Sequence, residues 1–403
     1  MKYVVVIGDG MADFPLESLG GRTPLEYLPL KSFETIGGGR LGRLRSCPAQ
    51  LSPGSDVAFL TLLGNDAAGV YSGRSPLEAA GMGVMLAPGE VAFRMNLVAL
   101  GDGPSGPVML SHNGGGVEGE DALILAKAVA GDPEFEKIGA ERGLTIHATD
   151  TFRHIAVARG RAADFLLTPP HDIAGQAVAP YLPGGPGGAW LGRLQAAASA
   201  AIENHPVNLA REKAGLKKAN SAWFWGAGEA CRLPDFTRKY GVTGTVVSAV
   251  PLVKGIAKLN HLKAPEVPGA TGLLNTNYEN KVAFALEALA SGDDFALVHI
   301  EAPDEMSHDG SLENKLEAIR RVDGRVVKPL LEKLPALGDF RLLLMPDHFT
   351  LLSTRTHDGT PIPFALYDSR VPSSPKPFTE KAAEGADVLE TGDALLKLLF
   401  EIG

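Results

Sequence analysis

MKYVVVIGDG, the stretch at residues 1–10, has the pattern of a strand followed by a tight turn. Residues 2–7 are rich in β-branched side chains, which is typical of a buried strand in a parallel sheet. Asp9 stands between two glycines directly after this strand. Because ligands of an open α/β sheet bind beyond the carboxyl ends of its strands, Asp9 is a candidate site residue.

Two later stretches repeat this arrangement. FALVHIE at 295–301 is followed by Asp304 and His308, and RLLLMP at 341–346 is followed by Asp347 and His348. Asp304 and His308 are four residues apart, so they face the same way if the segment coils, and one metal ion could take both. Helix and strand patterns alternate through this part of the chain, which predicts an α/β fold with a mainly parallel sheet and crossover helices.

The composition indicates a globular protein with more than one domain. The chain has 403 residues, whereas domains cluster around ~100 to 200 residues, so we expect two domains. A formal charge of -9 without any run of Lys and Arg argues against a nucleic-acid partner. The sequence shows no signal-peptide layout, no apolar stretch of ~20 residues and only two cysteines. We therefore expect a cytoplasmic protein with no membrane partner.

The pattern of predicted helices and strands changes near residue 86, and the earlier pattern returns near residue 268. Between these points, short strand-like segments such as VAFRMNLVAL at 91–100 are separated by glycine turns and acidic helices, which suggests a separate α+β module. We predict a discontinuous core domain of residues 1–85 and 269–403. Residues 86–268 are expected to form a smaller, inserted α+β domain.

Ser55 follows Pro53 and Gly54 at the start of a stretch that can form a helix. By itself it has the pattern of a helix cap. The candidate metal-ligating Asp and His residues elsewhere in the chain suggest that Ser55 is a nucleophile. A divalent cation stabilises the alkoxide of a serine, which is otherwise a poor nucleophile. The candidate two-metal site consists of Asp9, Ser55, Asp304, His308, Asp347, His348 and His357. Mixed carboxylate and imidazole donors favour Mn²⁺ or Zn²⁺, with Mg²⁺ or Co²⁺ possible.

Several segments resemble the alkaline phosphatase superfamily, and within it the archaeal-type, cofactor-independent phosphoglycerate mutases. They include DGMAD at 9–13, PGSDVAFLTLLGND at 53–66, YSGRSPLEAAG at 71–81 and VKGIAKL at 253–259, together with the spacing of the later Asp and His residues. The resemblance covers nearly the whole chain. It implies an alkaline-phosphatase-like three-layer core with an inserted substrate-binding domain. It also implies that 3-phosphoglycerate and 2-phosphoglycerate interconvert through a phosphoserine at Ser55, without bisphosphoglycerate.

The resemblance further implies how the candidate residues are used. Asp304, His308 and His357 would hold one metal ion, and Asp9, Ser55, Asp347 and His348 the other. A glycerate carboxylate and a phosphoryl group both favour arginine, whose fork of donors binds two oxygens at once. The candidate substrate-binding residues are Arg74, Arg94, Arg153, His154, Asp172 and Lys281.

SHNGGG at 111–116 departs from the family pattern, so other substrates stay open. One alternative is a related phosphotransferase or phosphohydrolase acting on another alcohol or phosphate ester, for example a proposed homoserine kinase. The sequence has no P-loop, so such a kinase would need an unusual phosphate donor site. A noncatalytic, metal-stabilised binding protein is a further alternative, but such a protein has no need of Ser55 at the metal. The oligomeric state is left open.

Overall fold

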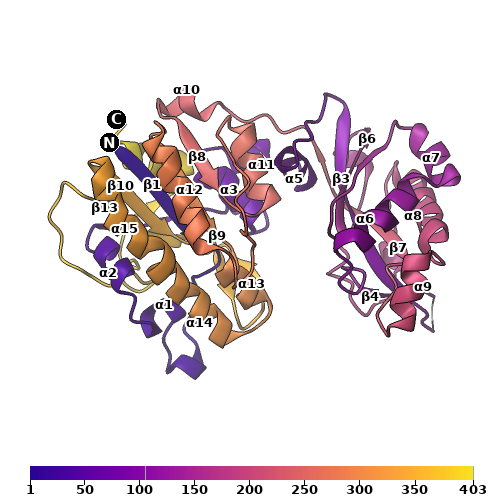
Figure 1. Cartoon of the computed structure of the whole chain (residues 1–403), viewed down its shortest axis with the longest axis horizontal. Helices are drawn as coiled ribbons and strands as arrows, with labels where there is room; N and C mark the ends of the chain where they lie inside the picture. The colour runs from indigo at the N-terminus through magenta and orange to yellow at the C-terminus, as the bar shows by residue number, and fades with distance from the viewer. Residues whose placement is uncertain (105, 403) are drawn as a thin grey trace. The chain divides into compact units, whose positions relative to one another are not determined.

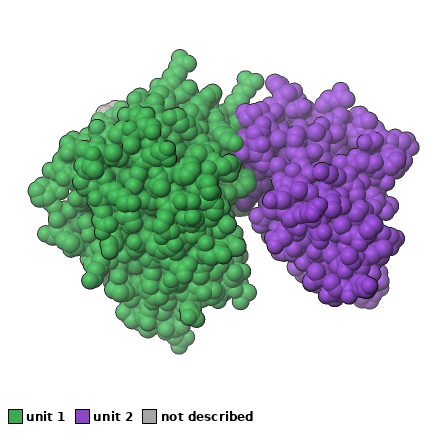
Figure 2. All heavy atoms as spheres, in the orientation of Figure 1, with its two compact units in different colours: residues 1–71, 232–403 green, residues 72–231 purple. Residues whose placement is uncertain are grey.

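The computed structural model describes residues 1–104 and 106–402. The chain folds into two compact units, which Figure 2 shows in different colours. Unit 1 comprises Met1–Tyr71 and Arg232–Gly403, and unit 2 comprises Ser72–Cys231. Unit 2 is therefore an insertion between two segments of unit 1.

Unit 1 is built on a seven-stranded sheet with the order β14-β2-β13-β10-β1-β9-β8 (Figure 1). Its strands are β1 (Lys2–Gly8), β2 (Arg40–Leu44), β8 (Gly244–Val247), β9 (Phe295–Ile300), β10 (Phe340–Met345), β13 (Ile362–Asp368) and β14 (Val388–Leu389). β1 lies between β9 and β10 and is parallel to both. β13 pairs antiparallel with β10 and β2, so it alone of these seven strands runs against the rest. The carboxyl ends of the other six strands therefore lie at one edge of the sheet, and those of β1, β9 and β10 are neighbours there.

Helices cover both faces of this sheet. They are α1 (Pro24–Tyr27), α2 (Lys31–Gly37), α3 (Ser55–Leu62), α4 (Ala67–Val70), α10 (Phe236–Tyr240), α11 (Pro251–Leu259), α12 (Tyr278–Ala290), α13 (Ala302–His308), α14 (Leu312–Arg321), α15 (Lys328–Lys333) and α16 (Gly392–Phe400), with the 3-10 helices η1 (Glu17–Leu19) and η5 (Leu334–Leu337) and the π-helix η4 (Val322–Val327). On one face, Val4 and Val6 share a buried cluster with residues of α2, α12 and α14. On the other face, Phe295 stacks on Phe236 of α10 and contacts Phe400 of α16 edge-on.

Alternate residues of β1 and β9 thus face two helical layers, as the period of two in a strand requires. The predicted α/β fold class, with its three-layer core and mainly parallel sheet, is confirmed. A short antiparallel hairpin of β11 (Phe349–Leu351) and β12 (Thr356–Asp358) follows β10.

Unit 2 has an antiparallel sheet centred on its longest strand, β3. Its strands are β3 (Glu90–Gly101), β4 (Val108–Ser111), β5 (Thr145–His147), β6 (Arg153–Arg159) and β7 (Ser221–Glu229), and its helices are α5 (Ser75–Gly81), α6 (Gly119–Ala130), α7 (Pro133–Ala140), α8 (Gly188–Ile202) and α9 (Pro206–Lys213), with the turns η2 (Ala162–Asp164) and η3 (Ala179–Tyr181). Residues of α6, α7 and α8 bury Phe93 and Met95 on one face of β3. α5 packs on the other face, where Ala79 contacts a cluster that includes Ala92.

The two boundaries differ from those expected at residues 85/86 and 268/269. α5 lies before residue 86, yet its apolar side packs on β3 and β6 of unit 2. β8 lies before residue 269, yet it pairs with β9 in the sheet of unit 1. Packing against a distant strand decides which unit α5 and β8 belong to, and the local amino-acid pattern does not reveal such contacts.

Candidate metal centre

The carboxyl edge of the unit 1 sheet carries the candidate ligands. Asp9 directly follows β1, and Asp304 and His308 lie in α13, which begins soon after β9. Asp347 and His348 occupy the turn between β10 and β11, and His357 lies in β12. The six residues form two groups, Asp9/Asp347/His348 and Asp304/His308/His357, and within each group the ligand atoms all lie within 4.8 Å of one another.

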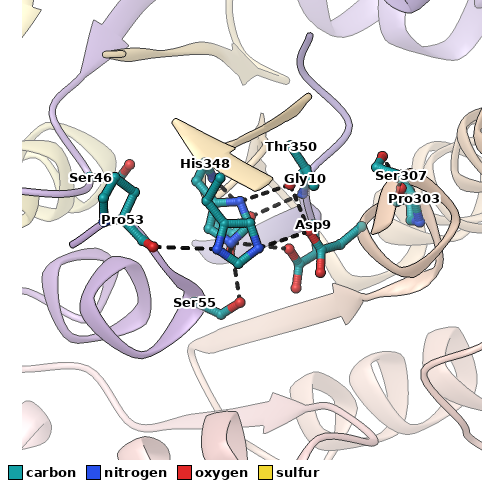
Figure 3. A network of polar contacts seen from close by, with 12 residues as sticks. Asp9, Gly10, Ser46, Pro53, Ser55, Pro303, Ser307, His348 and Thr350 are labelled. Atoms are coloured by element: carbon teal, nitrogen blue, oxygen red, sulfur yellow. Dashed lines mark hydrogen bonds and ion pairs between the residues drawn. The ribbon is translucent and has the colours of Figure 1, made fainter. Parts of the chain in front are cut away.

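The first group surrounds the nucleophile candidate. The Ser55 Oγ lies 3.2 Å from the Nε2 of His348. The same nitrogen lies 3.2 Å from the Oδ2 of Asp347 and 3.7 Å from the Oδ1 of Asp9. Figure 3 shows Asp9, Ser55 and the nearby pair His348 and Thr350, which come from three segments of the chain, gathered in one place. Ser55 is the first residue of α3 and Gly54 precedes the helix, so the Ser55 hydroxyl points into the group and does not cap the helix.

The second group has a carboxylate between two imidazoles. The Nε2 of His308 lies 3.2 Å from the Oδ2 of Asp304, and the Nε2 of His357 lies 3.4 Å from its Oδ1. The two Nε2 atoms are 2.9 Å apart. The ring of His357 also lies against that of His348, with centroids 4.0 Å apart, so the two groups are adjacent.

Backbone groups hold these side chains in place. The Oδ1 of Asp347 accepts hydrogen bonds from the backbone N–H groups of Gly10 and His348. The Nδ1 of His308 lies 2.9 Å from the carbonyl oxygen of Arg355, and the Nδ1 of His357 lies 3.4 Å from that of Pro53. When these nitrogens donate to the carbonyls, each Nε2 keeps its lone pair for a metal ion.

The electrostatics of the centre fit divalent cations. Burial, and next the nearby charge of Asp347 and Asp304, raises the pKa of Asp9 well above its ordinary value. Burial would also raise the pKa of Asp304, but hydrogen bonds from His308 and His357, when their Nε2 atoms carry protons in the metal-free site, hold it well below its ordinary value. The Oδ1 of Asp9 and the Oδ2 of Asp347 are buried and accept no hydrogen bond from the described residues. Buried carboxylate oxygens of this kind are costly unless a cation or donor meets them, so the residues present suit bound metal ions.

Contacts behind the ligands involve residues that the sequence did not reveal. The Nε2 of His299 lies 2.8 Å from the Oδ2 of Asp9, and its Nδ1 lies 2.9 Å from the Oγ of Ser248. Thr350 contacts both Asp304 and His348 through its hydroxyl group. His299 and Thr350 lie inside apolar strands, where a buried polar residue looks like any core position. Only the spacing of Thr350, two residues after His348, could have pointed to one of them.

Three of the candidate substrate residues lie near one another in unit 2. The carboxylate of Glu78 in α5 joins Arg74 and Arg94, with its Oε1 2.7 Å from the Nε of Arg74 and its Oε2 2.9 Å from the Nε of Arg94. The Arg94 guanidinium lies 4.6 Å above the ring of Trp225. Burial would raise the pKa of Glu78, but the charges of Arg94, Arg74 and Arg153 hold it below its ordinary value.

Two histidines lie close to these arginines. The ring centroid of His171 lies 5.3 Å from that of Trp225 and 6.1 Å from that of His112. Burial lowers the pKa of both histidines, and the positive charges of Arg94 and Arg153 lower it further. We call the surface formed by Arg74, Arg94 and Arg153, with the neighbouring rings of His112 and His171, the cationic face of unit 2; its positive charge comes from the arginines. His112 lies in the SHNGGG turn, the segment of the sequence that departs from the family pattern.

The remaining candidate substrate residues lie elsewhere. His154 follows Arg153 in β6, but it pairs with Met95 and lies on the opposite side of the sheet, fully buried under the helices. Burial lowers its pKa to about 4. Asp172 is exposed, with its Oδ1 3.5 Å from the Nε2 of His171. Lys281 belongs to unit 1, where its buried ammonium group donates to the carbonyl oxygens of His299 and Thr271.

Known proteins resemble the chain over its whole length. The sequence profile of the family described as 2,3-bisphosphoglycerate-independent phosphoglycerate mutase matches residues 37–208. The protein of that name from Methanosarcina acetivorans is 42% identical over 408 residues, an alignment covering 100% of both chains. The chain belongs to the 2,3-bisphosphoglycerate-independent phosphoglycerate mutase family. A relative from Geobacter sulfurreducens, named a probable member, is 40% identical over 408 residues and is also covered completely.

Solved structures with the same fold include the PH0037 protein from Pyrococcus horikoshii. It superimposes with a TM-score of 0.78 at 26% identity, covering 99% of this chain and 97% of the other. A cofactor-independent phosphoglycerate mutase from Thermoplasma acidophilum superimposes with a TM-score of 0.61 at 24% identity, covering 100% of both chains. The family assignment made from the sequence is confirmed.

None of the helices in residues 1–104 and 106–402 has the length and apolar content that crossing a bilayer requires. The cytoplasmic location stays a prediction from the sequence.

Proposed function

We propose that this protein interconverts 3-phosphoglycerate and 2-phosphoglycerate without added 2,3-bisphosphoglycerate, using Ser55 as the phosphoryl carrier. The observation that carries the proposal is the position of the Ser55 Oγ, 3.2 Å from His348 and beside two groups of metal-ligating side chains. The names of relatives that match from end to end support the same substrate.

In the proposed reaction, the Ser55 Oγ attacks the phosphorus of 3-phosphoglycerate. The bond from phosphorus to the substrate O3 breaks, and the proton of the Ser55 hydroxyl ends on that O3. The glycerate then reorients, and its O2 attacks phosphoserine, so that the proton of O2 returns to Ser55. Ser55 acts as a covalent carrier, which divides one difficult transfer into two displacements.

We propose that Asp304, His308 and His357 hold one divalent cation, and that Asp9, Asp347 and His348 hold the other together with Ser55. When bound, the cations would lower the pKa of the serine hydroxyl and neutralise charge on the transferring phosphoryl group. The donor set favours Mn²⁺ or Zn²⁺, with Mg²⁺ or Co²⁺ as further candidates. The backbone contacts of Asp347 and His308 keep these side chains oriented before substrate binds.

The cationic face of unit 2 is the proposed binding surface for the glycerate carboxylate or phosphoryl group. Glu78 holds Arg74 and Arg94 in place, and Trp225 supports the guanidinium plane of Arg94. Guanidinium groups fixed in this way bind an anion with little further loss of side-chain entropy. Asp172 would lie at the border of this surface, beside His171. We assign His154 and Lys281 to packing around the two sites, because both are fully buried.

An enolase-coupled assay tests this proposal. Purified protein, reconstituted in turn with Mn²⁺, Zn²⁺, Mg²⁺ and Co²⁺, is given 3-phosphoglycerate without bisphosphoglycerate. We expect 2-phosphoglycerate to form with at least one metal, and a phosphate adduct on Ser55 to appear by intact-mass spectrometry. Absence of turnover with all four metals would exclude this substrate.

Ser55→Ala and Ser52→Ala provide a matched pair, because Ser52 lies three residues earlier and is exposed. Ser55→Ala should lose both turnover and adduct, whereas Ser52→Ala should keep both. Free inorganic phosphate measured in the same reactions separates a mutase from a phosphatase. Consumption of ATP that depends on homoserine, without 2-phosphoglycerate formation, would favour the alternative kinase.

A further inference from the structure

Thr350 lies behind both groups of the candidate metal centre. It is the middle residue of β11, it is fully buried, and it pairs with His357 across the hairpin. Its backbone N–H donates to the carbonyl oxygen of Ala12, and its own carbonyl accepts from the Nζ of Lys315 at 2.7 Å. Main-chain contacts therefore fix the position of Thr350, and its side-chain hydroxyl is available for another role.

The hydroxyl of Thr350 connects one residue of each group. Its Oγ1 lies 2.6 Å from the Oδ1 of Asp304 and 3.1 Å from the Nδ1 of His348. A hydroxyl has one proton to donate, and an ionised carboxylate can only accept. In the short contact, the Thr350 hydroxyl therefore donates its hydrogen bond to the Asp304 carboxylate. The Oγ1 is left as an acceptor for an N–H from His348.

This direction of donation determines which nitrogen of His348 carries the proton. With the proton on Nδ1, the lone pair of Nε2 faces the Ser55 Oγ at 3.2 Å and the Asp347 Oδ2 at 3.2 Å. The other tautomer would place an N–H there and would leave Nδ1 facing an oxygen with no proton to offer. Metal-ligating histidines are commonly oriented by a partner on the nitrogen that does not bind the ion.

The backbone of Gly10 packs tightly against this contact. A Cβ at Gly10 would overlap the Oγ1 of Thr350 and lie 2.7 Å from the Oδ1 of Asp304. Gly10 also has a φ of +59°, a conformation that favours glycine. The turn after β1 therefore leaves room for one hydroxyl between Asp304 and His348.

We propose that Thr350 is a positioning residue that sets the tautomer of His348 and orients Asp304, so that one hydroxyl prepares both groups for metal ions. The inference rests on the proposed function for its biological meaning. Its measurements need neither substrate nor turnover, so the two proposals can fail separately.

The first test is the tautomer of His348 in the metal-free wild-type protein, read from ¹⁵N chemical shifts and two-bond ¹⁵N–¹H correlations near neutral pH. We expect the proton on Nδ1. A wild-type His348 with its proton on Nε2 would overturn the proposal, and this measurement does not depend on any variant folding.

The second test compares Thr350→Val, which replaces the hydroxyl by a methyl group, with Thr350→Ser, which keeps the hydroxyl and removes the methyl group. Calorimetric titration with Zn²⁺ and with Mn²⁺ should show affinity about 10- to 100-fold weaker in Thr350→Val, the range found when a partner behind a ligand is removed. Thr350→Ser should stay close to wild type, and the metal-free variants should unfold cooperatively. Equal losses in both variants would assign the effect to packing at this position, because Thr350→Ser keeps the hydroxyl, and would contradict the proposal, as would unchanged affinity in Thr350→Val.

Discussion

Unit 1 and unit 2 both collect charged side chains, but they compensate the charges differently. In unit 1, three carboxylates gather at the carboxyl ends of parallel strands, and two of their buried oxygens accept no hydrogen bond from the described residues. In unit 2, one buried carboxylate, Glu78, holds two arginines on one side of an antiparallel sheet. The first arrangement calls for cations from outside the chain, and the second carries its own counter-charge while presenting positive charge.

This difference separates two contributions to the proposed reaction. Substitutions in the unit 1 centre should affect the chemical step, because bound cations act on the charge that develops during phosphoryl transfer. Substitutions on the cationic face should affect mainly substrate binding, because its charges meet the substrate before and after the transfer. The variants below test this separation, from the largest expected effect to the smallest.

Asp347→Asn is expected to have the largest effect. The replacement keeps the oxygen that accepts hydrogen bonds from the backbone N–H groups of Gly10 and His348. The second carboxylate oxygen, which faces the site, is replaced by an amide nitrogen. An amide is uncharged and offers no ligand at that atom, so one cation should be lost. We expect kcat to fall on the order of 10³-fold or more, since a metal ion contributes several kcal/mol to transition-state stabilisation. Metal analysis by mass spectrometry, together with the enolase-coupled assay, checks both effects.

If Asp347→Asn kept its full metal content and lost activity only through a higher KM, unit 1 would behave as we expect of unit 2. The separation between the two units would then be wrong.

The ligands of the unit 1 centre could be predicted from the sequence because simple rules locate them. Asp9 and Asp347 each follow an apolar strand, and carboxyl ends of parallel strands meet at one edge. His299 and Thr350 could not be found in this way. They lie inside strands, and their importance comes from contacts with Asp9, Asp304 and His348 across the sheet and the hairpin.

The fold class was predictable for the same reason, but the inserted unit was predictable only in outline. Arginine at 74, 94 and 153 matches the demand for anion-binding groups, and the structure brings these residues together. Adjacent residues of a strand point to opposite faces, so Arg153 and His154 could not both lie on the cationic face. The sequence alone does not reveal which face of β6 the helices cover, and that decides between the two residues.

Glu78→Gln should have an intermediate effect, confined to binding. The amide keeps the shape of the side chain but removes the negative charge that holds Arg74 and Arg94. Loss of a charge-assisted hydrogen bond costs about 1.5–3 kcal/mol, so we expect KM for 3-phosphoglycerate to rise about 10- to 100-fold. Steady-state kinetics should show a smaller change in kcat, and metal analysis should show no loss of cations.

Glu141→Gln is the matched control, because Glu141 pairs with Arg193 on the exposed surface of the same unit. A fully exposed ion pair contributes little to stability, so this variant should resemble wild type in KM and kcat. A fall in kcat without a rise in KM for Glu78→Gln would contradict the binding role of the cationic face.

His154→Asn is expected to have the smallest effect on catalysis and a measurable effect on the pH dependence of stability. Burial lowers the pKa of folded His154 to about 4, against an ordinary value of 6.5. As the pH falls below 6.5, the unfolded chain binds a proton that the folded chain does not bind until about pH 4. The contribution of His154 to stability is therefore complete above pH 6.5 and is lost as the pH falls toward 4. By about pH 5 the loss amounts to about 2 kcal/mol in the free energy of unfolding.

Urea denaturation of wild type and His154→Asn, from about pH 7 to about pH 5, measures this difference. Wild type should lose about 2 kcal/mol more than the variant over that range, because asparagine does not titrate there. Kinetics complete the comparison, since Arg153→Met should raise KM whereas His154→Asn should leave it near the wild-type value. Because the two residues are neighbours in β6, an equal rise in KM for both variants would show that the binding surface is not confined to the face that carries Arg94.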